Sequence, residues 1–212
     1  MKPAMPFEQL VYFADPMCSW CYGFGTAMSS FAQAHPQLRL TLVMGGLRPY
    51  TKEAMMPAQK KQIREHWRHV QEASGQRFND ALLMQQDFVY DTEPASRAVV
   101  TARSMRQVDE LAFLKAIQVA FYRDARDVTR AEILADIAAE NGVDRAIFLS
   151  ALESGEMRDA VKRDFSLAQS LRVRGFPTLG VARADKLQLI VNGYTSAAAI
   201  EKSFAQLLAD AQ

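Results

Sequence analysis

The chain is poor in cysteine, in net charge and in long apolar runs. Only two of its 212 residues are cysteine, whereas a small secreted scaffold held by disulfides needs several, spread along the chain. No stretch approaches the roughly 18 consecutive apolar residues of a membrane-spanning helix. The formal net charge is +1, while a nucleic-acid-binding domain usually carries a basic surplus. We therefore expect a globular protein with no membrane segment and no nucleic-acid partner; composition does not fix its oligomeric state.

The beginning of the chain does not resemble a secretory signal peptide. Lys2 is its only basic residue, and Pro3 and Pro6 interrupt the segment. The apolar run at residues 10–14 is shorter than the hydrophobic part of a signal peptide, which takes about 7–15 residues. If Met1 is the natural start, we expect a cytoplasmic protein. The alternative is an engineered start after a removed leader.

The two cysteines form a C-x-x-C motif between a predicted strand and a predicted helix. Residues 9–14 are apolar, aromatic and β-branched, which is typical of a buried strand, and Asp15-Pro16 ends the run. From about Tyr22, apolar residues at helical spacing predict a helix that ends before Pro36. The motif therefore lies at a helix start, where backbone N–H groups carry partial positive charge and stabilise a thiolate.

Redox chemistry explains this pair better than structural stapling does. A disulfide across two intervening residues closes a very small loop and constrains the unfolded chain little. We predict that Cys18 is the nucleophile and that Cys21, one helical turn further on, attacks a mixed disulfide formed at Cys18. One alternative is a pair of buried, inert thiols. The other is a zinc site completed by His66 and His69, which is disfavoured because they lie much further along the chain than in a zinc finger. We therefore predict no metal.

Strand-like segments flank a long helical region. Residues 38–44 alternate apolar with other residues and end at Gly45-Gly46, which completes a strand–helix–strand unit. Two more strands are predicted at 178–182 and 187–191, followed by a last helix that begins after Thr195 or Ser196. The helices predicted between these two pieces are residues 55–73, 94–105, 109–122, 130–141, 144–154 and 156–171.

Several helix ends carry local signals. Pro94 fits a first helical position, and Thr129 with Glu132 resembles a capping box. The dipeptide 141–142, Asn-Gly, and Gly155 are typical helix stops. Three phenylalanines of this region are predicted to lie in the core: Phe113, Phe121 and Phe148.

The order of elements predicts an α/β fold of the form βαβ…ββα with a large all-helical insertion. Each β piece is too small to be stable alone, so we expect both to pair in one sheet. We predict one domain from residues 1–52 and 173–212 and an inserted helical domain from residues 53–172.

A second motif, Gly175-Phe176-Pro177-Thr178, directly precedes the third predicted strand. With it the chain resembles the thioredoxin superfamily, which places a cis-proline loop against the C-x-x-C. The resemblance implies a cis bond before Pro177 and a substrate that binds beside Phe176 and Pro177. The alternative is a trans proline at the start of an edge strand.

The helical insertion narrows the resemblance to the DsbA-like branch and, within it, to the FrnE-like disulfide isomerases. Four segments carry it: residues 15–21, 45–48, 90–95 and 175–178. It implies a thioredoxin fold with a helical lid, no cofactor, and a disulfide-containing protein or peptide as substrate. The expected activity is that of a thiol–disulfide oxidoreductase or disulfide isomerase, with glutathione or thioredoxin as a possible reductant.

The dipeptide between the cysteines departs from the Pro-His pair of periplasmic DsbA. Ser19 and Trp20 bring no imidazolium near Cys18, so we predict a less oxidising couple, which fits a reducing compartment. Trp20 is either a platform for apolar substrate or a packing residue under the insertion.

Other polar side chains are weaker candidates. Arg48, Asp91 and Glu93 could line the groove, although ordinary loop and helix-end charges are the more common explanation. His35 precedes a proline that ends a helix, and we predict that it is exposed.

Two other functions are compatible with this fold. Kappa-type glutathione transferases and chromene-carboxylate isomerases share the insertion topology but have no dithiol, so the Cys18/Cys21 pair argues against them. Some cytoplasmic DsbA-like proteins are adaptors that deliver partners to proteases, and in such a protein the thiols would only sense redox state.

Overall fold

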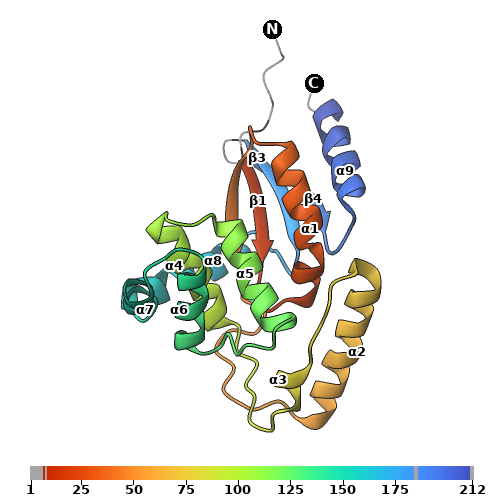
Figure 1. Cartoon of the computed structure of the whole chain (residues 1–212). Helices are drawn as coiled ribbons and strands as arrows, with labels where there is room; N and C mark the ends of the chain where they lie inside the picture. Colours follow the sequence, from red (N-terminus) through yellow and green to blue (C-terminus); the bar gives the residue numbers. More distant parts are fainter. Residues whose placement is uncertain (1–6, 8, 184–185, 211–212) are drawn as a thin grey trace.

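The computed structural model describes residue 7, residues 9–183 and residues 186–210. At its centre is a four-stranded sheet with the order β2-β1-β3-β4 (Figure 1). The strands are β1 (Gln9–Ala14), β2 (Arg39–Met44), β3 (Thr178–Arg183) and β4 (Lys186–Asn192). β1 pairs in parallel with β2 and antiparallel with β3, which confirms that the two β pieces share one sheet. The predicted link between the last two strands includes Ala184 and Asp185, which lie outside the described residues.

Alternate residues of β1 face opposite sides of the sheet, as the pleat requires. Leu10 and Tyr12 belong to the main core, where α1 (Ser19–Ala34) and α9 (Ala197–Asp210) cover the sheet. Val11 and Phe13 pack on the other side against Ala168 of α8 (Gly155–Ser170). The central strand is therefore buried on both faces, which explains its nearly continuous apolar sequence.

The region between β2 and β3 is helical, and all six helices predicted there are confirmed with ends that shift by at most two residues. A four-residue helix, α3, was not predicted because it is too short to show a periodic pattern. Figure 1 shows α2 and α3 beyond the end of the sheet where α1 begins. Besides α8, the helices of this region are α2 (Pro57–Ser74), α3 (Ala81–Met84), α4 (Glu93–Met105), α5 (Glu110–Tyr122), α6 (Ala131–Glu140) and α7 (Arg145–Leu152).

The signals at helix ends were less reliable than the helices themselves. The capping box at Thr129 is wrong, because the Thr129 hydroxyl donates to Asp127 at 2.6 Å and Arg130 is the N-cap residue. Gly155 is not a stop but the first residue of α8, where the Ser154 side chain accepts from the Met157 N–H group.

The other predicted helix ends agree with the structure more closely. Pro94 is the second rather than the first residue of α4, because the helix begins at Glu93. Gly142 has φ +84°, which confirms the helix stop at 141–142. The Ser196 side chain accepts from the Ala199 N–H group at 3.3 Å, which confirms its place before α9.

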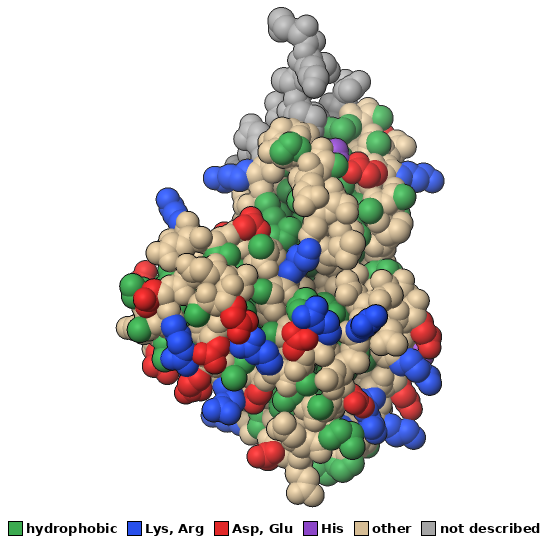
Figure 2. Space-filling view, in the orientation of Figure 1, with side chains coloured by type: hydrophobic (Ala, Val, Ile, Leu, Met, Phe, Trp, Pro, Cys, Tyr) green, Lys and Arg blue, Asp and Glu red, His purple; other side chains and the backbone are tan. Residues whose placement is uncertain are grey.

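One continuous hydrophobic core runs from the sheet into the helical region. It contains the three phenylalanines predicted to be core residues, each fully buried. The division into residues 1–52 with 173–212 and residues 53–172 stays a prediction. No helix in the described part of the chain is long and apolar enough to cross a bilayer. Basic and acidic side chains are interspersed over the lower part of the face seen in Figure 2.

Candidate active site

The C-x-x-C motif lies after the end of β1, at the start of α1. Cys18 is the N-cap residue of α1, with an extended backbone, and its N–H group donates to the Asp15 carbonyl at 3.1 Å. The helix thus begins three residues earlier than the predicted Tyr22. Both thiols are free; Cys18 is 6% exposed and Cys21 is fully enclosed. Cys18 is therefore the sulfur nearer the surface, and Cys21 lies behind it.

The surroundings of the Cys21 thiol disfavour its ionisation. Burial raises the pKa of Cys21, and its hydrogen bond with Cys18 and the charge of Cys18 raise that pKa further. The Asp15 backbone N–H opposes the shift. At rest, Cys21 therefore keeps its proton.

The predicted proline loop lies against the first cysteine. The Phe176–Pro177 peptide bond is cis, as expected, and the Cys18 thiol donates to the Phe176 carbonyl oxygen at 3.5 Å. Pro177 is buried while Phe176 is half-buried. The ring of Phe176 covers Gly45: a Cβ atom there would lie 2.0 Å from ring carbons. Gly45 thus makes room for the proline loop.

A cavity of about 540 Å³ opens beside Cys18. The segment after β1, the loop after β2, α2 and the proline loop all contribute walls. Of the lining side chains only Arg48 is a lysine, arginine or carboxylate, and its guanidinium lies 5.6 Å from the Tyr90 ring centre. The lining residues are Met17, Cys18, Ser19, Trp20, Leu47, Arg48, Gln59, Gln62, Ile63, His66, Trp67, Tyr90, Gly175 and Phe176.

The predicted site residues separate into two groups in this geometry. Cys18, Trp20 and Phe176 line the cavity, whereas Cys21 and Pro177 lie buried behind it. This arrangement places the Cys18 sulfur and the Phe176 backbone at a single opening, with the second sulfur behind it.

Trp20 lines the cavity and also packs against the helical region, and its role as a platform for apolar substrate stays a prediction. Its ring lines the cavity and packs between Tyr194, 5.2 Å away between ring centres, and His66 of α2, 5.7 Å away. The Tyr194 hydroxyl also donates to the Ala73 carbonyl at 2.9 Å. Trp20 therefore joins the redox motif to the helical region while keeping one face at the cavity.

The two histidines considered for zinc are both exposed on α2. Within the described residues, no group of three or more histidine, cysteine, aspartate or glutamate side chains is placed to hold a metal ion. The prediction that His35 is exposed is wrong. Its side chain is only partly exposed, because the ring pairs with Glu201 of α9 at 2.9 Å.

Asp15 was predicted from the sequence to be a strand breaker and part of the motif at residues 15–21, but no role in the site was assigned to its carboxylate. Its buried carboxylate accepts from the Met17 N–H at 2.8 Å and from the Leu47 N–H at 2.7 Å. Burial raises the pKa of Asp15 to about 6, although these N–H donors oppose the shift. Asp15 thus joins the turn before Cys18 to the loop after β2.

Two buried tyrosines form the floor of the motif. The Tyr90 hydroxyl donates to the Met17 carbonyl at 2.7 Å and lies 3.3 Å from the Tyr122 hydroxyl. Burial raises the pKa of both tyrosines. The resemblance had drawn attention to residues 90–95, but the contact of Tyr90 depends on a fold that sequence spacing does not reveal.

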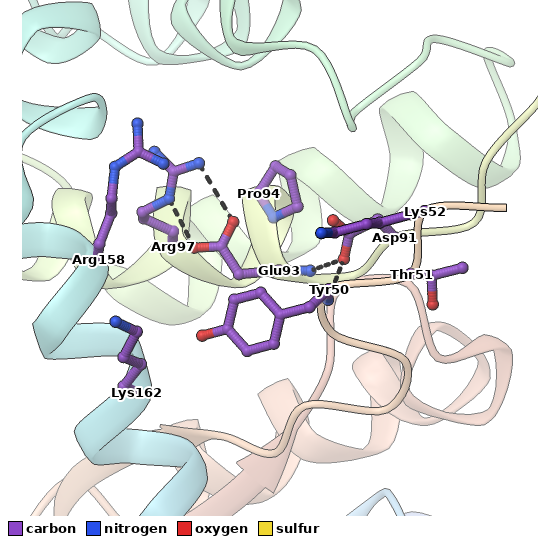
Figure 3. Close-up of a pocket in the computed structure, with 9 residues that line it drawn as sticks. All are labelled: Tyr50, Thr51, Lys52, Asp91, Glu93, Pro94, Arg97, Arg158 and Lys162. Carbon is purple, nitrogen blue, oxygen red and sulfur yellow. Dashed lines mark hydrogen bonds and ion pairs between the residues drawn. The ribbon is translucent and has the colours of Figure 1, made fainter.

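The acidic candidates Asp91 and Glu93 do not line the redox cavity. They border a second cavity of about 410 Å³ with Tyr50, Arg158 and other residues (Figure 3). The Asp91 carboxylate accepts from the Tyr50 N–H at 2.8 Å. No sulfur atom lines this second cavity.

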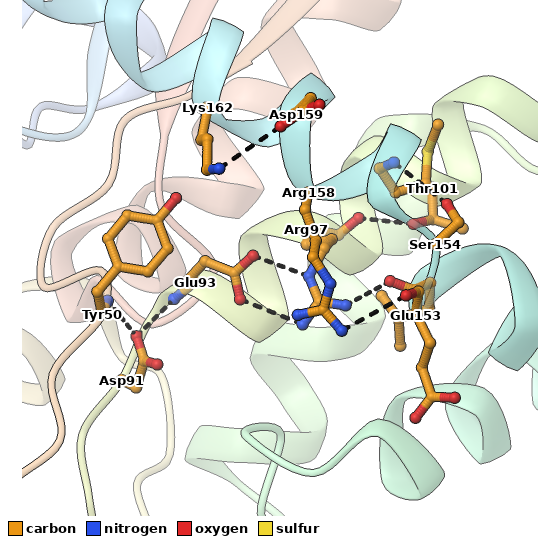
Figure 4. A network of polar contacts seen from close by, with 12 residues as sticks. Tyr50, Asp91, Glu93, Arg97, Thr101, Glu153, Ser154, Arg158, Asp159 and Lys162 are labelled. Carbon is orange, nitrogen blue, oxygen red and sulfur yellow. Dashed lines mark hydrogen bonds and ion pairs between the residues drawn. The ribbon is translucent and has the colours of Figure 1, made fainter.

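Glu93 has a structural partner instead. Its carboxylate receives two hydrogen bonds from Arg97, at 2.8 and 3.2 Å, and both side chains are 8% exposed (Figure 4). Arg97 also donates to the Leu152 carbonyl at the end of α7. This buried pair ties α4 to α7 and does not reach the cysteines.

The sheet order, the dithiol at the start of α1 and the cis-proline loop opposite it define a DsbA-like thiol–disulfide oxidoreductase fold. Residues 9–205 match the family described as the DSBA-like thioredoxin domain, and the chain belongs to this family. The narrower FrnE-like grouping stays a prediction.

Two solved structures are similar over nearly the whole chain. A proposed protein disulfide isomerase from Nitrosomonas europaea is 32% identical, with a TM-score of 0.88 over 95% of this chain and 97% of that one. The cytosolic disulfide reductase DsbM from Pseudomonas aeruginosa is 27% identical, with a TM-score of 0.78 over 94% and 98%. A second DsbM structure, with GSH, is 25% identical, with a TM-score of 0.77 over the same shares.

A curated relative is known for a different role. The ClpXP adapter protein SpxH of Bacillus licheniformis is 24% identical over 177 residues, which is 84% of this chain. The matched part spans 58% of the length of that relative.

Proposed function

We propose that the protein is a cytoplasmic disulfide reductase that works through a Cys18/Cys21 dithiol cycle. The observation that carries the proposal is the position of the Cys18 sulfur, at the mouth of a cavity and against the Phe176 carbonyl, with Cys21 enclosed behind it. In this arrangement Cys18 is placed to react with a substrate, whereas Cys21 is placed to react only with Cys18.

The cycle has two exchange steps. The Cys18 thiolate attacks one sulfur of a substrate disulfide, so that a Cys18–substrate disulfide forms and the other substrate sulfur leaves as a thiolate. Cys21 then attacks Cys18, forms the Cys18–Cys21 disulfide and releases the second substrate sulfur. The substrate gains two electrons, the dithiol loses them, and the protons of the dithiol match those taken up by the two products.

We further propose glutathione as the reductant that restores the dithiol. The cavity is large enough for a short peptide, and Arg48 is a cation suited to a peptide carboxylate. The DsbM structure with GSH supports this choice. Thioredoxin is the alternative reductant, and a protein or peptide disulfide is the proposed substrate.

A reducing direction also follows from the residues between the cysteines. Ser19 and Trp20 add no positive charge beside Cys18, and the similarity to a cytosolic reductase supports the same compartment. Equilibration with glutathione should give a potential well below the roughly −120 mV of DsbA. A value as high as that of DsbA would contradict the direction proposed.

Insulin reduction with glutathione tests the cycle. Cys18→Ser should abolish turnover, because Cys18 is the only cysteine among the described residues that line the cavity. Cys21→Ser should still attack substrate but accumulate a mixed disulfide at Cys18, which mass spectrometry detects. Turnover that survives in Cys18→Ser refutes the assignment. An isomerase would also use Cys18, but would rescue scrambled ribonuclease in the Cys21→Ser variant.

The similarity to SpxH favours a second candidate, an adaptor for a protease. An adaptor surface does not need the dithiol, so binding to ClpX should survive in a Cys18→Ser/Cys21→Ser variant. Loss of binding in that variant, or no binding by the parent, would exclude the adaptor function.

A further inference from the structure

Tyr12 carries a buried hydroxyl whose purpose the resting structure does not explain. It lies in the middle of β1, between its sheet neighbours Leu42 of β2 and Leu179 of β3. The side chain is fully buried, and its ring packs on Phe24 of α1 at 5.9 Å between ring centres. Among the described residues, its hydroxyl oxygen has no partner in a well-formed hydrogen bond. Buried hydroxyls without a partner are costly and uncommon.

The polar group beside this hydroxyl is the thiol of Cys21. Cys21 lies one helical turn before Phe24 on the buried face of α1 against which the Tyr12 ring packs, and all three side chains belong to one core cluster. In agreement with this placement, burial and then the charge of Cys21 raise the pKa of Tyr12, although no hydrogen bond joins the two groups in the dithiol state. A neutral thiol is a weak acceptor, whereas a thiolate is a strong one. The best partner for the Tyr12 hydroxyl therefore exists only while Cys21 is ionised.

We propose that Tyr12 is a catalytic residue of the resolving step, where its hydroxyl donates a hydrogen bond to the Cys21 thiolate as this sulfur attacks Cys18. The proposal rests on the dithiol cycle described above and adds the group that makes its second step possible.

The step balances without another reactant. Cys21 loses its proton, its sulfur forms the bond to Cys18, and the bond between Cys18 and the substrate sulfur breaks. The electron pair of that bond leaves with the substrate sulfur, which takes up one proton. Tyr12 keeps its own proton throughout, because burial and the neighbouring sulfur charges raise the pKa of Tyr12 well above its usual value. It is a donor and not a base.

Cys21 needs such a donor more than Cys18 does. Burial, the Cys18 sulfur and the Asp15 carboxylate all disfavour a charge on Cys21, whereas the Asp15 backbone N–H favours it. Cys18, in contrast, has the start of α1 and an open cavity beside it. A second donor at Cys21 would make its thiolate available when the mixed disulfide is present.

The most direct test measures the ionisation of Cys21 itself. In a Cys18→Ser background, the ultraviolet absorbance of the thiolate is followed against pH, with the Cys18→Ser/Cys21→Ser variant subtracted to remove tyrosine signals. Adding Tyr12→Phe should raise the midpoint by about one pH unit, a tenfold loss of thiolate, as expected for a hydrogen bond to a charged group. An unchanged midpoint overturns the proposal.

Tyr22→Phe is the matched control. Tyr22 follows Cys21 in the sequence, but its hydroxyl donates to the Arg77 carbonyl at 3.2 Å. Tyr22→Phe should leave the midpoint of the Cys21 titration unchanged. An equal shift in Tyr12→Phe and Tyr22→Phe would overturn the specific role of Tyr12. Tyr12→Phe removes only an unpartnered hydroxyl, so its melting temperature should be equal or higher. A lower melting temperature or loss of folding would mean that the hydroxyl is structural.

Kinetics then separate this proposal from the proposed function. In the chain with both cysteines, Tyr12→Phe should slow release of the second product thiol about tenfold while alkylation of Cys18 keeps its rate. If the parent protein forms no mixed disulfide, the reductase function fails, and the Cys21 titration still decides whether Tyr12 stabilises its thiolate.

Discussion

The thiol of Cys18 lies 3.5 Å from the carbonyl oxygen of Phe176, which is 158 positions away in the sequence. The pairing of β1 with β3 brings the two together, since Phe13 is the register partner of Thr178. Strand pairing thus holds the sulfur and the proline loop side by side, although the whole helical region separates them in the sequence.

Gly45→Ala should displace the proline loop. A Cβ atom at this position would lie 2.0 Å from the Phe176 ring, so the ring must move. We expect a loss of about 1–3 kcal/mol in unfolding free energy and a several-fold loss of insulin reduction. Gly155→Ala is the control, because nothing lies within 4 Å of its added methyl. Equal behaviour of the two variants in urea titrations would contradict the packing argument.

Asp15 should make stability depend on pH. Its pKa is about 6 when folded, against a usual value of 3.8, so the folded state holds this proton more tightly than the unfolded chain does. The corresponding stability is complete below pH 4 and is lost as pH rises towards 6 and above. The shift of two units corresponds to about 3 kcal/mol.

Asp15→Asn removes this titration, although the amide cannot accept from both N–H donors. Between pH 4 and pH 7 the parent should lose about 3 kcal/mol of unfolding free energy that Asp15→Asn does not lose. Urea titrations of both proteins at the two pH values measure this difference. Exposed Asp87, substituted with Asn, is the control. Parallel curves for Asp15→Asn and the parent would show that the carboxylate is not perturbed.

The buried pair of Arg97 and Glu93 should matter for stability and not for catalysis. Arg97→Met leaves the Glu93 charge buried without its partner, which should cost about 3–5 kcal/mol. Adding Glu93→Leu should recover most of the loss. Breaking the exposed pair of Arg68 and Glu72, each 66% exposed, should change stability by less than about 0.5 kcal/mol. A double variant as unstable as Arg97→Met would contradict this explanation.

Arg48 should influence the use of glutathione. Arg48→Gln is expected to raise the KM for glutathione about 3- to 10-fold with little change in kcat, because the cavity loses its only lysine or arginine. The difference should shrink at high salt. Arg64→Gln on α2 is the control, since Arg64 does not line the cavity. An unchanged KM would remove Arg48 from the proposed binding site.

Most of the fold was predictable because its signals are local. The strand that ends at Asp15, the helix that follows it and the amphipathic helices after β2 each show their period within a few turns. The cis-proline loop followed from a motif together with the order of elements. Short signals failed where a neighbour competed: the Thr129 side chain binds Asp127 instead of capping a helix.

The finer structure of the site was not predictable because it depends on contacts between distant segments. Asp15 joins a loop 32 positions away, and Tyr90 reaches a carbonyl 73 positions away. Arg48 lines the redox cavity, whereas Asp91 and Glu93 border the second cavity, although the sequence did not distinguish these three candidates. An apolar strand pattern also hides the hydroxyl of Tyr12, since tyrosine is an ordinary strand residue.

The most direct measurement is the order in which the two thiols react. The reduced protein is treated with limiting iodoacetamide at neutral pH, and peptide mass spectrometry locates the adduct. We predict modification at Cys18 with Cys21 unmodified, at a rate that increases with pH as the thiolate forms. First reaction at Cys21, or resistance of both thiols in the folded protein, would contradict the account.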